Sequence, residues 1–271
     1  STHCISSAAS DVYKRQAHVD WQSGEDSGID VSPDVKAEYL FSDSYVLYLH
    51  ALGGRELNDY RRLNAFSPYW SLNARMPSTY VPLNATLGFK ASPVNGLWFN
   101  IFGGYRISKD ELFCNLVDAD GYYFTHFLQD KAKTAYGGAE LKYGYKDWFD
   151  ASLKGTFYSW KTDNENEELY LMTKPKFELN FYAEAKVFEG LKVYLGYEYV
   201  QRKEYVIEEG NSSRDFGLGN ISNLSVGASY TFLKDLSVFG RVNNLLNKQY
   251  YYEYGYPAEK LNVLAGLSLV F

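Results

Sequence analysis

The chain has 271 residues, a formal net charge of −6 and an aromatic fraction of 18%, with 26 tyrosines. An acidic chain lacks the basic face that binding to a phosphate backbone requires, so nucleic acid is excluded as a partner. No run of about 18 apolar residues occurs, which excludes a transmembrane helix, whereas a membrane-spanning β-strand needs only about 9–11 residues. Cys4 and Cys114 lie far apart and outside metal-binding spacings, so we expect no metal site and no cofactor.

Residues 1–16 show no alternation of apolar and polar side chains. They also lack the charged, apolar and small-residue order of a signal peptide. We expect this segment to be non-native or disordered and assign the fold to residues 17–271. Because an exported protein carries a signal peptide, the natural beginning of the protein is expected to lie upstream.

From residue 34 onward, apolar residues alternate with polar ones, as in Phe177, Leu179 and Phe181 against Glu178 and Asn180. A period of two places each set on one face of a β-strand. About eleven strands are predicted, and residues 18–22 are a candidate twelfth. The predicted strands are 34–41, 45–52, 81–91, 97–107, 135–145, 149–157, 177–187, 191–199, 224–232, 236–242 and 261–271.

Short turns alternate with long polar stretches between these strands. The longest stretches are 53–78, 108–133 and 244–260, and within the second, residues 122–129 are a candidate strand that extends beyond a membrane. Transmembrane barrels have short periplasmic turns and longer extracellular loops. A soluble sandwich would have strands of about five or six residues and no reason for this alternation. The sequence therefore predicts an all-β fold, the wall of an antiparallel transmembrane β-barrel with 11–12 long strands.

Residues 236–271 resemble the carboxy-terminal segment of TonB-dependent outer-membrane receptors. The resemblance rests on an Asn-Leu-Leu-Asn-Lys-Gln-Tyr motif, a Gly-Tyr-Pro and a terminal strand that fits an assembly signal; the matching positions are Asn244, Leu245, Tyr250, Gly255, Tyr256, Pro257, Gly266, Leu269 and Phe271. Ala258, Glu259 and Lys260 replace the family's Pro-Gly-Arg. Leu264 stands where the assembly signal prefers a polar residue.

The family has a closed barrel of about 22 strands around an amino-terminal plug. With half the strands and no plug, the chain is expected to be an incomplete barrel, the carboxy-terminal half of such a receptor. The resemblance implies energised uptake of a scarce nutrient across the bacterial outer membrane, the nutrient being a siderophore, cobalamin, haem or a glycan. Implied partners are membrane lipid, the missing strands and plug, the TonB complex acting through that plug, the barrel-assembly machinery and a small-molecule or glycan ligand.

Two other functions compete with this interpretation. A self-contained, 12-stranded porin-like pore would have the same alternation. An outer-membrane hydrolase would need a Ser-His pair, but His50 and His126 have no GxSxG-type motif beside them. We therefore predict that the chain is not an enzyme and has no catalytic residues.

Aromatic and cationic side chains in the long loops are the candidate ligand contacts, because they suit a sugar ring or an anionic chelate. These candidates are Tyr60, Arg61, Arg62, Tyr69, Trp70, Tyr122, Tyr123, Tyr250, Tyr251 and Tyr252. The alternative is that the loop aromatics pack against one another. The polar register of the strands is modestly basic, with Lys154 and Arg241 among its cations.

Overall fold

Twelve strands of the computed structural model form one antiparallel sheet in the order β1-β2-β3-β4-β5-β6-β7-β8-β9-β12-β13-β16. The structure describes residues 11–22, 28–70, 76–119, 122–165, 167–203, 206–209, 212–215, 218–233, 235–253 and 256–269. The strands of the sheet are β1 (Asp11–Gln22), β2 (Gly28–Ser42), β3 (Tyr45–Glu56), β4 (Thr79–Val94), β5 (Leu97–Ala119), β6 (Tyr122–Tyr145), β7 (Phe149–Thr162), β8 (Pro175–Phe188), β9 (Leu191–Arg202), β12 (Ile221–Leu233), β13 (Leu236–Asn243) and β16 (Asn262–Leu269).

Short elements lie in the connections between these strands. They are α1 (Tyr60–Phe66), α2 (Glu167–Leu171), the hairpin of β10 (Val206–Glu209) and β11 (Ser212–Asp215), and the pair β14 (Tyr251–Glu253) and β15 (Tyr256–Pro257). Among the described residues, neither helix has the length and apolar character needed to span a bilayer.

The predicted strands are confirmed, and the candidate strand at residues 18–22 is part of β1. That strand begins at Asp11, where its backbone pairs with Tyr39 of β2. The domain boundary predicted at residue 17 therefore falls inside a strand, and residues 11–16 belong to the sheet. Residues 1–10 lie outside the described part of the chain.

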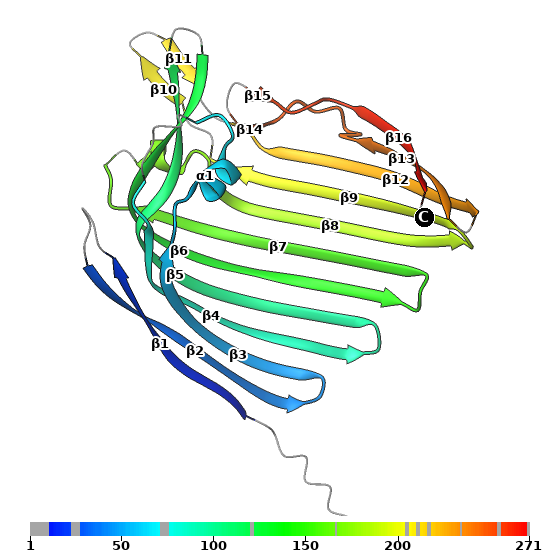
Figure 1. Ribbon diagram of the computed structural model, residues 1–271, viewed down its shortest axis with the longest axis horizontal. Helices are drawn as coiled ribbons and strands as arrows, with labels where there is room; N and C mark the ends of the chain where they lie inside the picture. The colour runs from blue at the N-terminus through cyan, green and yellow to red at the C-terminus, as the bar shows by residue number, and fades with distance from the viewer. Residues whose placement is uncertain are drawn as a thin grey trace, which may run out of the picture.

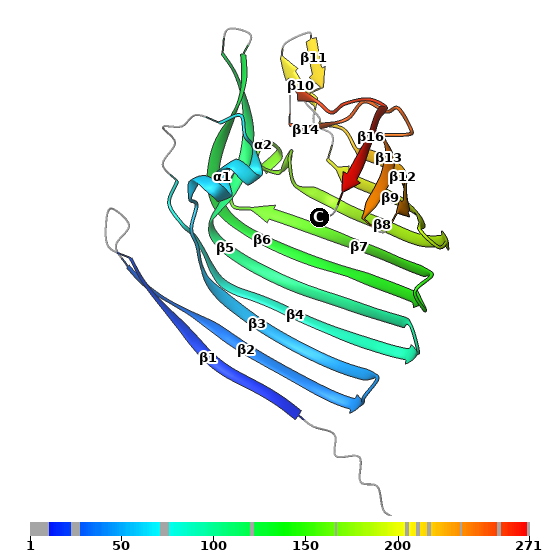
Figure 2. The same ribbon diagram turned by 45° about the vertical axis from the view of Figure 1, so that its right-hand side comes forward.

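The sheet is open, as expected for an incomplete barrel. Within the described residues, β1 pairs with β2 alone and β16 with β13 alone. Figures 1 and 2 show these two strands at opposite edges of a strongly curved sheet. The short turns lie together at one end, which we call the short-turn end, and the long connections lie at the other, the long-loop end.

The two faces of the sheet differ in chemistry. Apolar side chains stay exposed on one face, for example Ile101 at 57% and Leu267 at 72%. The other face carries polar rows that run across the strands in register. One such row consists of Asn100, Glu140, Lys154, Asn180, Glu198 and Asn223. An exposed apolar face opposite a polar one is typical of a wall between lipid and a wet interior.

The long loop predicted at residues 108–133 is instead a hairpin of two strands, and the candidate strand at residues 122–129 is confirmed as the beginning of β6. Strands β5 and β6 continue through this stretch. After a register shift between Ser108 and Glu111 of β5, the two strands pair with each other as far as Ala119 and Tyr122. This hairpin extends beyond the sheet at the long-loop end (Figure 2). On one side Leu112, Cys114 and Phe127 pack against Leu63 of α1; on the other, Phe113 and Ala132 pack against Leu171 and Met172 at α2. The extension is therefore stabilised by a small core on each side.

Gly190 forms part of the short turn between β8 and β9. Its φ of 86° lies in the left-handed region that favours glycine, and a Cβ there would lie 2.4 Å from the carbonyl oxygen of Thr231. The Gly190 carbonyl accepts a hydrogen bond of 2.9 Å from the Thr231 amide. The turn between β8 and β9 is thus joined to β12 by a backbone hydrogen bond.

Gly190→Ala should lower the free energy of unfolding by about 1–3 kcal/mol, because it adds backbone strain and a clash. Gly196→Ala is the matched control, since its Cβ would meet nothing within 4 Å. Thermal unfolding in detergent, followed by circular dichroism, measures both. Equal midpoints for the two variants would contradict the argument.

Candidate functional site

The candidate site lies at the long-loop end, where the segment around α1, the β5–β6 extension, α2 and the β14–β15 segment meet (Figure 2). Helix α1 begins after Asp59, whose carboxylate accepts a 2.9 Å hydrogen bond from the Arg62 amide. This is ordinary N-capping, which satisfies a donor that the helix leaves free. Leu63 then anchors the helix on the hairpin, while Tyr60 and Arg61 point to solvent.

The predicted loop aromatics contact one another. The Tyr60 and Trp70 rings are 5.7 Å apart, and Trp70 meets Phe127 edge-on at the same centroid distance. Tyr69 stacks on Tyr256 with ring centroids 3.6 Å apart. These ring contacts cover part of each side chain, yet Tyr60 remains 62% exposed and Tyr69 remains 40% exposed. They can therefore still contact a ligand, and that role stays a prediction.

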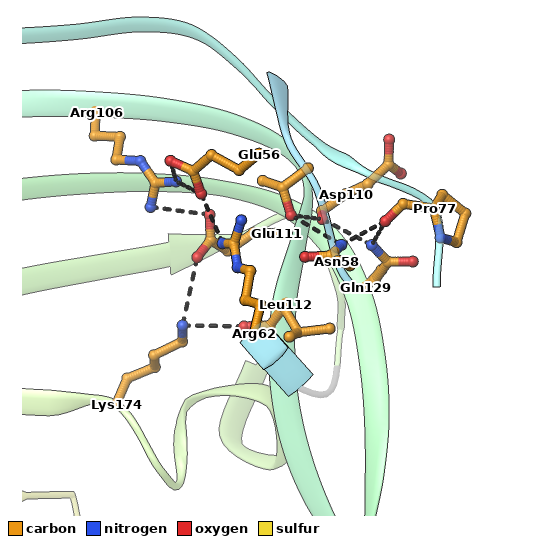
Figure 3. Close-up of polar contacts among 11 residues, drawn as sticks. Glu56, Asn58, Arg62, Pro77, Arg106, Asp110, Glu111, Leu112, Gln129 and Lys174 are labelled. Atoms are coloured by element: carbon orange, nitrogen blue, oxygen red, sulfur yellow. Dashed lines mark hydrogen bonds and ion pairs between the residues drawn. The ribbon is translucent and has the colours of Figure 1, made fainter. Parts of the chain in front are cut away.

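A chain of ion pairs joins α1 and α2 to β5 (Figure 3). Glu56 receives Arg62 at 2.6 Å and Arg106 at 3.1 Å. Arg106 also lies 3.0 Å from Glu111, which in turn lies 3.5 Å from the Lys174 ammonium. Lys174 comes from the segment between α2 and β8, so this network connects four separate segments, which are β3, α1, β5 and the segment after α2.

Glu111 is the centre of this network, with a side chain only 3% exposed. Burial alone would raise the pKa of Glu111, but the charges of Lys174 and Arg106 outweigh it, and the pKa lies below its ordinary value. For Lys174 burial acts in the opposite direction and lowers the pKa, because it disfavours the charged ammonium, and the negative charge of Glu111 opposes that lowering. Each charge is therefore held in the interior by the other.

Lys174 has further partners that the sequence did not reveal. Its ammonium donates to the Leu112 carbonyl at 3.0 Å and lies 4.9 Å from the Phe113 ring centroid and 4.8 Å from that of Trp160. A cation over aromatic faces is attracted by their electron density, most strongly where water is excluded. Lys174 therefore holds the segment after α2 against β5 and β7 at the long-loop end.

A second contact set fixes the strand that returns from α1 (Figure 3). The Pro77 carbonyl accepts from the side-chain amides of Asn58 and Gln129, the latter at 2.8 Å. Gln129 also donates to the Asp110 carbonyl at 3.0 Å, which accepts from Thr79 at 2.8 Å. Asp110, with φ of 54°, is the residue at which β5 shifts register.

Asn244 of the carboxy-terminal motif organises the connection after β13. It is 1% exposed, and its side-chain amide donates to the carbonyls of Lys248 and Glu259 at 2.7 and 3.0 Å. Its φ of 48° is one that asparagine tolerates better than most residues. Leu245 continues the link by donating to the Leu224 carbonyl at 2.8 Å. The motif thus has a structural task, which is to hold the last long connection to β12 and β16.

The tyrosines of the last connection differ in their surroundings. Tyr250 is buried at 5% exposure, whereas the hydroxyl of Tyr252 donates to Glu198 at 2.8 Å. The Tyr251 carbonyl accepts from Arg202 at 2.7 Å. Among the other predicted residues, Tyr122 and Tyr123 lie in β6, but their side chains, like Gly255 and Phe271, lie outside the described part.

The terminal strand carries the remaining residues of the resemblance. A Cβ on Gly266 would lie 2.6 Å from the Phe239 ring, so the glycine makes room for a cross-strand aromatic. Leu269 is exposed on the apolar face, and Pro257 pairs with Tyr251 in the β14–β15 segment.

A cavity of about 780 Å³ lies on the polar face of the sheet. Lys142, Lys154, Tyr182, Tyr194 and Arg241 contribute to its lining. Lys142 lies 2.9 Å from Glu140, whereas Lys154 and Arg241 make no ion pair or hydrogen bond within the described residues. Glu140 and Glu198 also line the cavity, so its three cations exceed its carboxylates by one, and aromatic rings lie beside them.

No group of three or more metal-ligating side chains occurs among the described residues. His50 lies 3.5 Å from Glu38, a contact between neighbouring positions of the polar face.

Glu111→Gln should lower the stability of the long-loop end by about 3–5 kcal/mol, because it leaves Lys174 buried without a counter-charge. Since the pKa of Glu111 is lowered, its contribution is complete above the ordinary glutamate range and is lost as the pH falls through the lowered value. Hydrogen exchange of the β5–β6 extension measures the effect. The control is Glu140→Gln, whose partner Lys142 is 57% exposed and which should change stability by at most about 1 kcal/mol; similar protection in both variants would refute a central role for Glu111.

Asn244→Ala should destabilise the connection between β13 and β16 by about 1–3 kcal/mol, because it removes the buried amide that donates to the carbonyls of Lys248 and Glu259. Limited proteolysis of the folded protein measures this as faster cleavage in that connection. Gln249→Ala, an exposed change in the same segment, is the control and should be cut at the wild-type rate. An unchanged rate for Asn244→Ala would show that the motif does not hold the connection.

No family model matches the chain, and none of the curated proteins does. Solved structures do match. The ferripyoverdine receptor of the outer membrane of Pseudomonas aeruginosa, bound to ferripyoverdine, has a TM-score of 0.67 and 16% identity, over 95% of this chain and 36% of that one. The ferric-catecholate import receptor Fiu of E. coli K12 has a TM-score of 0.61 and 14% identity, over 96% of this chain and 41% of that one.

The copper transporter OprC also matches, with a TM-score of 0.59 and 12% identity, over 91% of this chain and 41% of that one. The chain therefore spans well under half the length of each of these proteins. At such low identity the similarity shows the fold. The chain has the fold of part of the barrel wall of outer-membrane receptors, and the resemblance to TonB-dependent receptors is confirmed at that level.

Proposed function

We propose that the chain is the carboxy-terminal part of the barrel wall of a TonB-dependent receptor, which takes up a scarce nutrient across the bacterial outer membrane. The observation that carries the proposal is the match of 95% of this chain, with its open, twelve-stranded sheet, to 36% of a ferripyoverdine receptor. Unpaired strand edges are costly in lipid. The strands that complete the barrel are therefore essential partners, and a plug inside it would be the part that contacts TonB.

The distribution of apolar side chains supports a location in the membrane. Aromatic residues are exposed beside the short turns, among them Tyr145, Trp148 and Phe188 at 52%, 58% and 53%. Such rings suit the boundary between lipid and water. In this orientation the short-turn end is periplasmic, and the site described above faces the outside of the cell. Lipid and the barrel-assembly machinery are then further partners.

We further propose that the cargo is an anionic metal chelate of the siderophore type. The matched proteins are a ferripyoverdine receptor, a ferric-catecholate import receptor and a copper transporter. On the polar face, Lys154 and Arg241 are available to attract negative charge, and Tyr182 and Tyr194 offer ring faces nearby. Cationic and aromatic groups together suit a negatively charged, ring-containing ligand.

Uptake of a radioactive ferric siderophore tests the proposal in cells that produce the complete protein. Uptake should saturate and should stop when a protonophore collapses the energy supply. A passive porin-like pore would instead give uptake that does not saturate and resists the protonophore, and that result would overturn the proposal. Saturable, energised uptake of cobalamin, haem or a glycan, but not of the siderophore, would refute the cargo alone.

Replacing both Lys154 and Arg241 by alanine should raise the half-saturating siderophore concentration about tenfold, equivalent to about 1.4 kcal/mol of lost attraction. Lys146→Ala is the matched control, because it removes a cation at the short-turn end, where it lies over Tyr145. Equal half-saturating concentrations in the double variant and the wild type would show that these two cations do not attract the cargo.

A further inference from the structure

Two lysines stand directly opposite each other on the apolar face of the sheet. Lys133 of β6 pairs with Lys161 of β7, and on its other side Lys133 pairs with Ile107 of β5. Ile107 lies six residues from Ile101, which is 57% exposed on the apolar face, and alternate residues of a strand share a face. Both lysines are exposed, so their ammonium groups lie on the outer side of the wall.

The charges of this pair are not balanced within the described part of the chain, where neither ammonium makes an ion pair or a hydrogen bond. Lys131, two residues along β6, adds a third exposed cation. Of the aspartates nearby in the sequence, Asp130 pairs with Glu111 and belongs to the opposite face, and Asp163 lies past the end of β7. Like charges directly opposite each other destabilise a sheet. An anion bound between the two lysines would remove that cost.

The position of the pair along the strand matches the outer boundary of the membrane, in the orientation on which this inference rests. On β6, 12 residues separate Lys133 from Tyr145, which is exposed beside a short turn. A tilted strand crosses the hydrocarbon in about 9–11 residues. Lys133 and Lys161 therefore lie at the level of the lipid headgroups on the long-loop side.

A hollow in the apolar face lies between this pair and the short-turn end. Its volume is about 560 Å³, which is within the range of sites for small molecules. Ala139 and the rings of Phe157 and Phe177, whose centroids are 4.3 Å apart, contribute to its lining. Glu140 also borders the hollow, but its carboxylate lies 2.9 Å from Lys142 on the polar face. The hollow therefore suits a hydrocarbon chain.

Small side chains lie between the two lysines and the hollow, namely Ala135 and Gly137 on β6 and Ser159 on β7. From Lys161 to Phe157 the path along the strand is about 13 Å, at about 3.3 Å per residue. One leaflet contributes about 15 Å of hydrocarbon, half of a core that is about 30 Å thick. An acyl chain that descends from a headgroup at the lysines therefore reaches the hollow.

We propose that Lys133, Lys161 and the hollow form a docking site for one membrane lipid whose headgroup carries a phosphate. The two ammonium groups donate charge-assisted hydrogen bonds to the phosphate oxygens, and one acyl chain lies in the hollow. A zwitterionic lipid fits the pair less well, because its headgroup adds a positive charge of its own. The site lies on the outer side of the wall, so it is separate from the cavity proposed for the cargo.

Native mass spectrometry of the complete protein in detergent tests the site, with dioleoyl phosphatidic acid and dioleoyl phosphatidylcholine as probes. The wild type should retain phosphatidic acid at lower lipid concentrations than phosphatidylcholine. Lys133→Gln and Lys161→Gln should each weaken the binding of phosphatidic acid about fivefold, the usual contribution of one lysine near an anionic headgroup. The control is Lys192→Gln, which removes a cation from the polar face, where Lys192 lies 3.0 Å from Glu184, and it should bind like the wild type.

The hollow and the headgroup can be tested separately. Ala139→Leu fills part of the hollow with another apolar side chain and should weaken the binding of phosphatidic acid. Inorganic phosphate should not displace the lipid, and full displacement would show that the lysines bind only an ion. Equal retention of the two lipids by the wild type, or unchanged binding in both lysine variants, would overturn the site.

Thermal unfolding gives a second measurement, which also shows that the variants fold. In phosphate-free detergent Lys133→Gln should unfold about 1–3 °C above the wild type, because the repulsion is removed. Phosphatidic acid should reverse this order, because the wild type binds it more tightly. The same order in both conditions would contradict the argument from repulsion. Neither measurement needs cargo or energy, so the lipid site can fail while energised uptake succeeds, and the reverse.

Discussion

Backbone hydrogen bonding between neighbouring strands is the constraint on which this structure depends. In lipid no water is present to satisfy an amide or a carbonyl, so each must find its partner in the sheet. Within the described residues each of the twelve strands pairs with a neighbour on both sides, apart from the outer edges of β1 and β16, and the ladders are interrupted only at register shifts such as that between Ser108 and Glu111. Those edges are where the described sheet is incomplete. The long-loop end is free of the constraint, and there helices, ion pairs and bent strands replace the regular ladder.

At the long-loop end, where the strand ladder no longer fixes the backbone, polar contacts between side chains hold the segments in place. Glu111 belongs to β5 and Lys174 to the segment after α2, two segments that the ladder does not hold together, and a buried ion pair joins them instead. A buried ion pair adds little stability compared with apolar packing, but each charge accepts only a few arrangements of its partners. Such a network therefore sets the geometry of α1 and α2 relative to the wall. The contact of Glu253 with Thr125 joins the β14–β15 segment to β6 in the same way, with fewer partners.

Where one face of a strand meets lipid and the other a polar interior, alternation alone predicted the structure. Phe177, Leu179 and Phe181 against Glu178 and Asn180 identify β8 without any knowledge of its neighbours. The same pattern fails in the β5–β6 extension, because Leu112 and Phe113 on opposite faces are both buried and both apolar. Asp110 then breaks the period at the register shift. Strand β1 was missed before residue 17 because Lys14, Arg15 and Gln16 interrupt its alternation.

The site was predictable only as a set of residue types. Aromatic and cationic side chains in the loops are visible in the sequence, but their partners are not, because Lys174 and Glu111 stand 63 residues apart. The sequence singled out Asn244 only through its resemblance to a family motif. The structure explains its place there, because Asn244 has a left-handed backbone conformation and its side-chain amide donates to two carbonyls of one connection.

The strict sequence order of the twelve strands has a consequence for how such walls change over time. In this sheet β2 through β13 each bond only to the strand before and the strand after them. Each hairpin is therefore a modular unit that lies between the preceding hairpin and the following one. Duplication or loss of one hairpin leaves every other pairing intact and changes only the circumference. Barrels of this design can therefore widen or narrow two strands at a time, while the long connections diverge independently at the rim.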